Sequence, residues 1–302
     1  MGDQMYLFPE VADSHVKAAI ERVKDARNFS EHLRMGKLYV AFSGGKDSVC
    51  LYWVCKLAAE ELGIDLLDMC EFHYHVTTVD PPELIWFIRE NFPFVHMDRP
   101  RKTMWKLIAT RCNMPPTRLV RYCCYELKEG GGDGRFCLTG VRRAESVKRS
   151  KRAVFESQDK DISKRIMLND NEDFRQEIEH CIPRQKYVVN PIIDWTDDQV
   201  WDFIRSEKIP YCCLYDEGWE RIGCIGCPMA TTRIREEEFA RYPKYKEAYI
   251  RAFQRMLDNC KARGTATSGD WKTGEDVFLW WMYGETGKKA EQAEVLFDDE
   301  DA

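Results

Sequence analysis

Apolar and polar residues follow one another along the chain in blocks that predict helices and strands in turn. Apolar side chains recur at helical spacing over residues 14–35, 49–62 and 83–90. Short apolar runs suited to buried strands stand at residues 37–42, 66–72, 94–97, 136–139 and 187–189. This alternation predicts an α/β fold, in which a parallel twisted sheet carries helices on both faces.

Changes in sequence character divide the chain into three expected parts. Residues 1–36 form an N-terminal helical segment, residues 37–229 an α/β domain, and residues 230–302 a helical C-terminal region with an acidic tail. Glycine and cysteine cluster at the second boundary, near residues 218–229. Residues 148–181 are highly charged without a sustained apolar period, which predicts an insertion or a mobile flap.

Composition and charge narrow the class of protein. The 302 residues are 44% hydrophobic, which is typical of a folded globular chain, and the net charge of −6 argues against non-specific coating of nucleic acid. The N-terminus lacks the basic and apolar regions of a signal peptide, and apolar runs are too short to span a membrane. We therefore expect a cytoplasmic protein without membrane contact, whose 13 cysteines are buried, metal-binding or catalytic rather than disulfide-bonded.

A short polar loop at residues 43–48 carries the first candidate chemistry. Gly44 and Gly45 leave a buried strand and enter a helix, an arrangement that lets backbone N–H groups approach phosphate oxygens. Serine hydroxyls and the Lys46 cation lie in the same turn. The spacing fits neither the Walker loop nor the dinucleotide fingerprint. An ordinary Gly-Gly turn is the alternative interpretation.

The sequence Ser-Gly-Gly-Lys-Asp-Ser at residues 43–48 resembles the PP-loop of the N-type ATP pyrophosphatases, the adenine nucleotide alpha-hydrolase-like superfamily. Three further stretches, at residues 138–146, 190–201 and 210–227, are similar to elements of the phosphoadenosine phosphosulfate (PAPS) reductase family, so that the likeness covers roughly residues 37–230. The resemblance implies a Rossmann-like sheet that binds ATP.

The resemblance also implies site residues. The nucleotide-binding set comprises Ser43, Gly44, Gly45, Lys46, Asp47, Ser48, Gly140, Arg142 and Arg143, of which Lys46, Asp47 and Arg142 are the expected catalytic residues. Both arginines follow a strand and a glycine, and guanidinium groups pair well with phosphate or sulfate. Asp80 either contacts the nucleotide or a metal, or caps the helix that follows two prolines.

Four cysteines form a candidate metal site. Cys224 and Cys227 make a C-x-x-C motif, and the adjacent Cys123 and Cys124 offer two more thiolates. The set is similar to the ligands of the iron–sulfur branch of the PAPS reductase family, which implies one [4Fe-4S] cluster. A zinc ion with four thiolate ligands is the alternative.

Two departures from the reductases decide between the reactions that the resemblance offers. The PP-loop keeps Lys46 and Asp47, which the reductases typically lose, and the only cysteine after Cys227 is Cys260, outside any Glu-Cys-Gly-x-His segment. We therefore expect an enzyme that cleaves ATP, with Mg²⁺, to an AMP-acceptor and pyrophosphate and transfers sulfur. Reduction of adenylyl sulfate (APS) or PAPS to sulfite is one alternative, and a non-catalytic sensing or docking protein is another.

The expected partners follow from this reaction. They are ATP, a nucleic acid or small-molecule acceptor, a sulfur-donor protein such as a cysteine desulfurase, and a second copy of the chain in a homodimer. An aromatic block at residues 271–281 either stacks on bases or belongs to a hydrophobic core, and the core is favoured because its aromatics have helical spacing.

Overall fold

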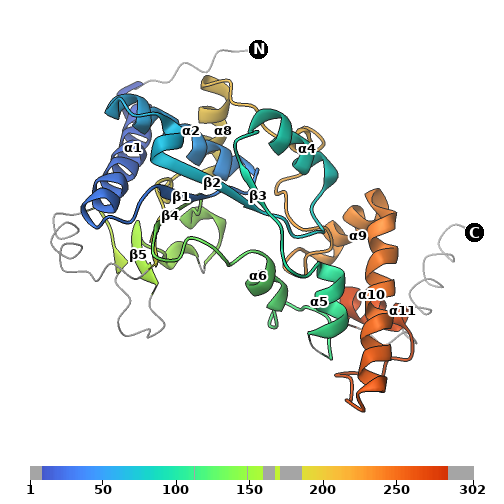
Figure 1. Cartoon of the computed structure of the whole chain (residues 1–302). Coiled ribbons are helices and arrows are strands. Elements are labelled where there is room, and N and C mark those ends of the chain that lie inside the picture. The colour runs from blue at the N-terminus through green and yellow to red at the C-terminus, as the bar shows by residue number, and fades with distance from the viewer. Residues whose placement is uncertain (1–8, 112, 148, 159–166, 171–185, 285–302) are drawn as a thin grey trace, which may run out of the picture. The chain divides into compact units, whose positions relative to one another are not determined.

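The computed structural model describes residues 9–111, 113–147, 149–158, 167–170 and 186–284 (Figure 1). Its contacts group the chain into two units, each made of segments that are separate in the sequence. The first unit comprises Met1–Tyr74, Glu83–Asp98 and Gly131–Ile222, and the second comprises His75–Pro82, Arg99–Gly130 and Gly223–Ala302. The helix at the N-terminus belongs to the first unit, because it packs on the helix that follows the first strand.

A seven-stranded sheet organises the first unit, with strand order β3-β2-β1-β4-β7-β5-β6. The strands are β1 (Leu38–Ala41), β2 (Cys70–His75), β3 (His96–Asp98), β4 (Phe136–Thr139), β5 (Phe155–Gln158), β6 (Met167–Leu168) and β7 (Lys186–Val189). Strand β1 pairs in parallel with β2 and β4, and β4 pairs in parallel with β7. The predicted α/β fold is confirmed.

Helices precede, connect or follow these strands along the chain. They are α1 (Pro9–His32), α2 (Lys46–Leu62), α3 (Leu66–Met69), α4 (Pro82–Asn91) and α8 (Asp197–Ser206). Helix α2 packs against both α1 and α8. Its buried face is largely apolar and includes Val49, Leu51 and Val54, so burial of this face fixes the helix on the sheet.

Two stretches differ from the sequence prediction. The expected strand at residues 66–72 begins as α3, because the Asp65 carboxylate accepts hydrogen bonds from the N–H groups of Leu67 and Asp68 and caps a helical turn. Within the charged stretch at residues 148–181, β5 and β6 extend the sheet, and β5 runs antiparallel to β7. Residues 159–166 and 171–185 lie outside the described residues, as does the predicted acidic tail.

In the described part of the second unit the helices are α5 (Met104–Thr110), α6 (Tyr122–Leu127), α9 (Thr232–Arg241), α10 (Pro243–Ala262) and α11 (Gly274–Tyr283). Helix α10 packs against both α5 and α11. The Trp281 ring of α11 is buried, with its centroid 4.8 Å from that of Tyr249 and 5.3 Å from that of Phe253. The interpretation of the C-terminal aromatic block as hydrophobic core therefore holds for Trp281.

Within the described part of the chain, no helix combines the length and the apolar character that crossing a bilayer requires.

Candidate functional site

The PP-loop lies at a reversal in the strand order of the first unit. The chain leaves β1 toward β2 on one side, whereas β4 adjoins β1 on the other side. Parallel sheets bind ligands in the crevice beyond the carboxyl ends of their strands at such a switch point. The PP-loop follows β1 directly, and the loop that carries Gly140 and Arg142 follows β4. Two predicted nucleotide-binding segments therefore meet at one edge of the sheet.

Glycine at position 44 is a geometric requirement of the PP-loop. Its φ of +72° lies in the left-handed region, and an added Cβ would lie 2.8 Å from the Leu84 and Ile88 methyl groups of α4. The Ser48 hydroxyl donates to the Gly45 carbonyl at 2.9 Å. These contacts hold the loop against the first turn of α2.

A network of charged side chains surrounds the start of α2. Arg142 donates from Nε to Asp47 at 2.6 Å and from Nη2 to Asp197 at 2.8 Å. Its Nη1 donates to the Trp195 carbonyl at 3.1 Å. The Lys46 ammonium lies 3.3 Å from the Asp197 carboxylate and 3.6 Å from that of Asp47. Arg142, 1% exposed, thus joins the loop after β4 to the PP-loop and to α8.

Opposite charges shift the pKa values of Arg142 and Asp197 in this network. Burial alone would lower the pKa of Arg142, but Asp47 and Asp197 more than offset that effect and raise it. Desolvation would raise the pKa of Asp197, yet Arg142 and then Lys46 lower it. The ion pairs therefore bring the predicted catalytic residues Lys46, Asp47 and Arg142 together. Arg142 faces these carboxylates, and its direct contact with a nucleotide stays a prediction.

Gly140 and Arg143 take different positions from each other. A Cβ on Gly140 would lie 3.0 Å from the Asp47 carbonyl and 3.1 Å from the Ser48 nitrogen, so backbone packs on backbone there. Arg143 instead pairs with Asp194 and lines a polar cavity of about 580 Å³. The structure therefore brings Gly140 to the PP-loop and turns Arg143 toward a neighbouring cavity.

Sequence reasoning missed two residues of this site. The Tyr215 hydroxyl accepts a hydrogen bond of 2.9 Å from the Lys46 backbone N–H, and burial raises its pKa. Asp197 completes the ion network described above. Both residues lie inside stretches that resemble the PAPS reductase family, so the resemblance located the segments but did not distinguish these side chains.

The four predicted metal ligands gather in the second unit. Cys123 and Cys124 lie on α6, and their thiols are hydrogen-bonded to each other, which raises the pKa of Cys123. Negative charge on Cys224 and Cys227 raises the same pKa further, so all four sulfurs act on one another. Among the described residues, no group of three or more Cys, His, Asp or Glu side chains is arranged as a ligand set for a metal ion.

Thiolate chemistry is favoured at one cysteine. The hydrogen bond from Cys123 lowers the pKa of Cys124 to about 6, with help from the charges of Lys128 and Arg121. The Lys128 ammonium also lies against the Cys224 sulfur, and its interaction with Cys224 raises the pKa of the lysine. Lys128 was missed by sequence reasoning, although it stands one helical turn after Cys124. A thiolate and a cation therefore coexist here near neutral pH.

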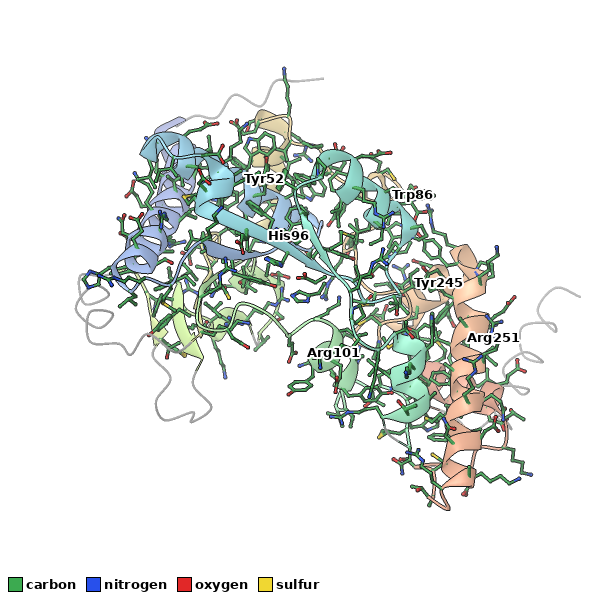
Figure 2. All side chains as sticks on the ribbon, viewed as in Figure 1. Tyr52, Trp86, His96, Arg101, Tyr245 and Arg251 are labelled. Carbon is green, nitrogen blue, oxygen red and sulfur yellow. The ribbon has the colours of Figure 1, made fainter. Side chains whose placement is uncertain are left out.

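The loop at residues 77–80 adjoins the cysteines. The Cys224 thiol donates to the Thr77 hydroxyl at 3.5 Å, and that hydroxyl donates to the Asp80 carboxylate at 2.6 Å. Asp80 also accepts from the Thr77 N–H at 2.7 Å. Tyr245, labelled on α10 in Figure 2, donates to the Asp80 carbonyl at 3.1 Å. The Asp80 carboxylate thus organises a turn beneath Cys224.

Residues 224–227, the cysteine knuckle, are held by the C-terminal helices. Gly226 donates its N–H to Glu238 at 2.6 Å, and Tyr249 donates its hydroxyl to the Ile225 carbonyl at 2.9 Å. A Cβ on Gly226 would lie 2.5 Å from the Phe239 ring, and the φ there is +71°. Helices α9 and α10 therefore fix the backbone between the two cysteines.

Comparisons with known proteins agree with the motif positions. A family model for the phosphoadenosine phosphosulfate reductase domain matches residues 37–230. The adenosine 5'-phosphosulfate reductase of Oceanobacillus iheyensis is 27% identical over 207 residues, 64% of this chain and 77% of that protein. An uncharacterized protein of Methanocaldococcus jannaschii is 25% identical over 252 residues, 79% of this chain but 45% of that relative. The chain thus spans less than half of the second relative's length.

Among solved structures, the U34-tRNA thiolase NcsA from Methanococcus maripaludis with its [4Fe-4S] cluster aligns over 86% of this chain and 83% of that chain. The sequence identity is 11% and the TM-score is 0.37. Since this TM-score is low, the fold assignment rests on the strand order of the sheet.

Proposed function

Because the chain belongs to the phosphoadenosine phosphosulfate reductase domain family, we propose that it is an ATP pyrophosphatase that couples ATP cleavage to sulfur transfer. The observation that carries this proposal is the fixed pair of PP-loop ions, Lys46 and Asp47, which Arg142 and Asp197 hold at the N-terminus of α2. ATP offers its β and γ phosphates to the Lys46 ammonium. A nucleotide without these phosphates has no group that the ammonium would bind.

The proposed reaction has two steps. An oxygen of the acceptor attacks the α phosphorus of ATP, the bond from that phosphorus to the pyrophosphate oxygen breaks, and pyrophosphate leaves with Mg²⁺. A sulfur nucleophile then attacks the activated carbon of the acceptor and displaces AMP. Lys46 and the N-terminus of α2 stabilise negative charge on the phosphates, so catalysis rests on positioning and electrostatics.

The cysteine quartet of Cys123, Cys124, Cys224 and Cys227 would hold the metal group of this proposal. Four soft thiolate donors suit an iron–sulfur cluster or zinc. The lowered pKa of Cys124 and the adjacent Lys128 fit an anionic thiolate–metal group. When bound, a [4Fe-4S] cluster supplies iron that can carry sulfur. Zinc would instead have a structural role.

Reduction of APS or PAPS is the second candidate, and it is favoured by similarity to the Oceanobacillus APS reductase. The two reactions are distinguished by their products. Incubation with APS or PAPS and reduced thioredoxin yields sulfite only if the reductase assignment is correct. Incubation with ATP and an acceptor yields pyrophosphate only if the proposed function is correct.

The Lys46→Ala variant tests the proposed function. With anaerobically purified protein, ATP, Mg²⁺ and a panel of RNA, DNA and small acceptors, we expect pyrophosphate release to fall by about 100-fold, because one charged donor to the phosphates is lost. Lys56→Ala, on the exposed face of the same helix and near Glu60, is the matched control and should retain the wild-type rate. An unchanged rate in Lys46→Ala would remove the proposal. Tight ATP binding without turnover by the wild type would favour a sensing protein.

A further inference from the structure

The Tyr215 hydroxyl caps helix α2 at the PP-loop. Its oxygen accepts a hydrogen bond of 2.9 Å from the backbone N–H of Lys46, the first residue of α2. Gly45, which precedes the helix, has no side chain to serve as a cap, and an added Cβ there would lie 3.4 Å from the same hydroxyl. A residue 169 positions further along the chain therefore supplies the acceptor that a serine, threonine or aspartate side chain usually provides at a helix start.

Contacts with α8 and with its own turn keep Tyr215 in place. The ring packs edge-on against Trp201 of α8, with centroids 5.2 Å apart, and the Tyr215 N–H donates to the Cys212 carbonyl at 3.1 Å. Helix α8 also presents Asp197, whose carboxylate lies 3.3 Å from the Lys46 ammonium. The same helix thus positions one group at the side chain of Lys46 and another, through Trp201, at its backbone. Withdrawal of the hydroxyl from the Lys46 N–H would disturb this packing.

The Tyr215 hydroxyl still has a proton to donate. A phenol donates one hydrogen bond and can accept another at the same time. Burial raises the pKa of Tyr215, so the hydroxyl keeps its proton at neutral pH. Within the described residues, the hydrogen bond from Lys46 is the only one that this hydroxyl makes, so its proton is not engaged. The charge of Asp47 also acts on Tyr215, but that carboxylate accepts from Arg142 at 2.6 Å.

We propose that Tyr215 is a phosphate-binding residue of the PP-loop site, whose hydroxyl accepts from the Lys46 N–H and donates its own proton to a phosphate oxygen of ATP. This inference rests on the proposed function, because it requires a polyphosphate at the start of α2. A hydroxyl that accepts from a backbone N–H is polarised and becomes a stronger donor. The Lys46 N–H thus acts on the phosphate through Tyr215, alongside the Lys46 ammonium, and a donor that is already fixed needs no rearrangement.

A competing role follows from the same contact. A phosphate oxygen that took the Lys46 N–H for itself would expel the Tyr215 hydroxyl, because the two acceptors would occupy one position. The packing of the Tyr215 ring on Trp201 opposes this exchange. The two roles predict opposite changes in the affinity for ATP when the hydroxyl is removed, so one measurement decides between them.

Two tyrosine substitutions test the phosphate-binding role. Tyr215→Phe removes the hydroxyl and keeps the ring. Tyr211→Phe is the matched control, because Tyr211 packs on the same Trp201 ring with centroids 5.4 Å apart, but its hydroxyl donates to Asp216 at 2.9 Å. Each protein is checked for folding by circular dichroism and titrated by calorimetry with two probes, beside Lys46→Ala. The probes are α,β-methylene ATP with Mg²⁺, which resists cleavage between the α and β phosphates, and adenosine, which has no phosphate.

For Tyr215→Phe we expect about tenfold weaker binding of α,β-methylene ATP than for wild type, because a hydrogen bond to a charged group is lost. Its affinity for adenosine should match that of wild type, since adenosine carries no phosphate. Tyr211→Phe should match wild type with both probes. With ATP and the acceptor panel, pyrophosphate release at subsaturating ATP should fall in Tyr215→Phe by the same factor as the affinity.

The outcomes separate this inference from the proposed function. Equal or tighter binding of α,β-methylene ATP by Tyr215→Phe, beside weaker binding by Lys46→Ala, would overturn the role of Tyr215 and leave the PP-loop as the ATP site. An equal loss of affinity for adenosine would also overturn it, because the hydroxyl would then not act on a phosphate. A wild type that does not bind α,β-methylene ATP, or a Lys46→Ala protein that binds it as tightly as wild type, would refute the proposed function itself.

Discussion

Two buried arginines show how the first unit and the second unit differ. Arg142 donates to two carboxylates and a carbonyl, and these carboxylates raise its pKa. Arg235 donates from one nitrogen, and burial lowers its pKa. The charge of Arg142 is thus balanced by two carboxylates, whereas two nitrogens of Arg235 have no hydrogen-bond partner among the described residues. The PP-loop site is therefore held by ion pairs between protein groups, whereas the buried arginine of the second unit has hydrogen-bonding groups without a partner in the described part of the chain.

The two acidic partners differ in the same way. Asp197, beside Arg142 and Lys46, has a lowered pKa and stays ionised. Glu238, which caps the cysteine knuckle, has a pKa raised to about 7 by burial. Preorganised charges suit electrostatic stabilisation of a phosphate, because they need no rearrangement when the ligand arrives. Buried ionisable groups that lack an oppositely charged partner are instead typical of a site that a bound ion would stabilise.

The strongest test of this comparison is Arg142→Met. It would leave Asp47 and Asp197 without their main cation and the Trp195 carbonyl without a donor, so we expect the free energy of unfolding to fall by about 4 kcal/mol. Urea denaturation measures it. Arg205→Met, on the exposed face of α8, is the control and should change stability by less than about 0.5 kcal/mol. A small effect of Arg142→Met would mean that the network is not what fixes the PP-loop.

The second test is the pH dependence of Glu238. A pKa of about 7 in the folded state, against an ordinary value of 4.5, means that the native protein binds a proton more tightly than the unfolded chain between these pH values. The resulting stability is present below pH 4.5, is lost as pH rises to about 7, and amounts to about 3 kcal/mol at most. Glu238→Gln should lack this slope while its amide oxygen still accepts from Gly226.

Urea denaturation of wild type and Glu238→Gln at equal metal content, from pH 4.5 to pH 8, measures the difference. Glu237→Gln, an exposed neighbour near Arg233, should run parallel to wild type. If the stability of Glu238→Gln and that of wild type changed with pH in parallel, the pKa of Glu238 would not be raised by folding. Glu238 would then not differ from Asp197 in this respect.

Local patterns predicted the first unit better than the second. Strand β4 coincides with the apolar run at residues 136–139, and the PP-loop stands between a strand and a helix as its glycines indicated. These features depend on neighbours in sequence. The α3 turn was missed because the Asp65 cap overrides a mainly apolar stretch that alone suits a strand.

Sequence reasoning named the cysteines as a candidate site, which stays a prediction, but it did not name the residues that hold the cysteine knuckle in place. Glu238 and Tyr249 contact the knuckle from ordinary helical positions 12 and 24 residues further along the chain, so neither spacing nor resemblance marked them. Their roles follow from their burial and from the hydrogen bonds that they make to the backbone of residues 224–227. The PP-loop network shows the same limit, since Tyr215 and Asp197 reach Lys46 only in the folded chain.

A matched pair of tyrosine substitutions gives the finest comparison of the two sites. Tyr249→Phe leaves the buried Ile225 carbonyl without its donor and should cost about 1.5 kcal/mol. Tyr215→Phe frees the Lys46 N–H at a half-buried helix start, where water can replace the hydroxyl, and should cost about 0.5 kcal/mol. Urea denaturation of the two variants measures both. If Tyr215→Phe proved the more costly, the PP-loop would depend on buried contacts as strongly as the knuckle does, and its backbone would be closed to phosphate.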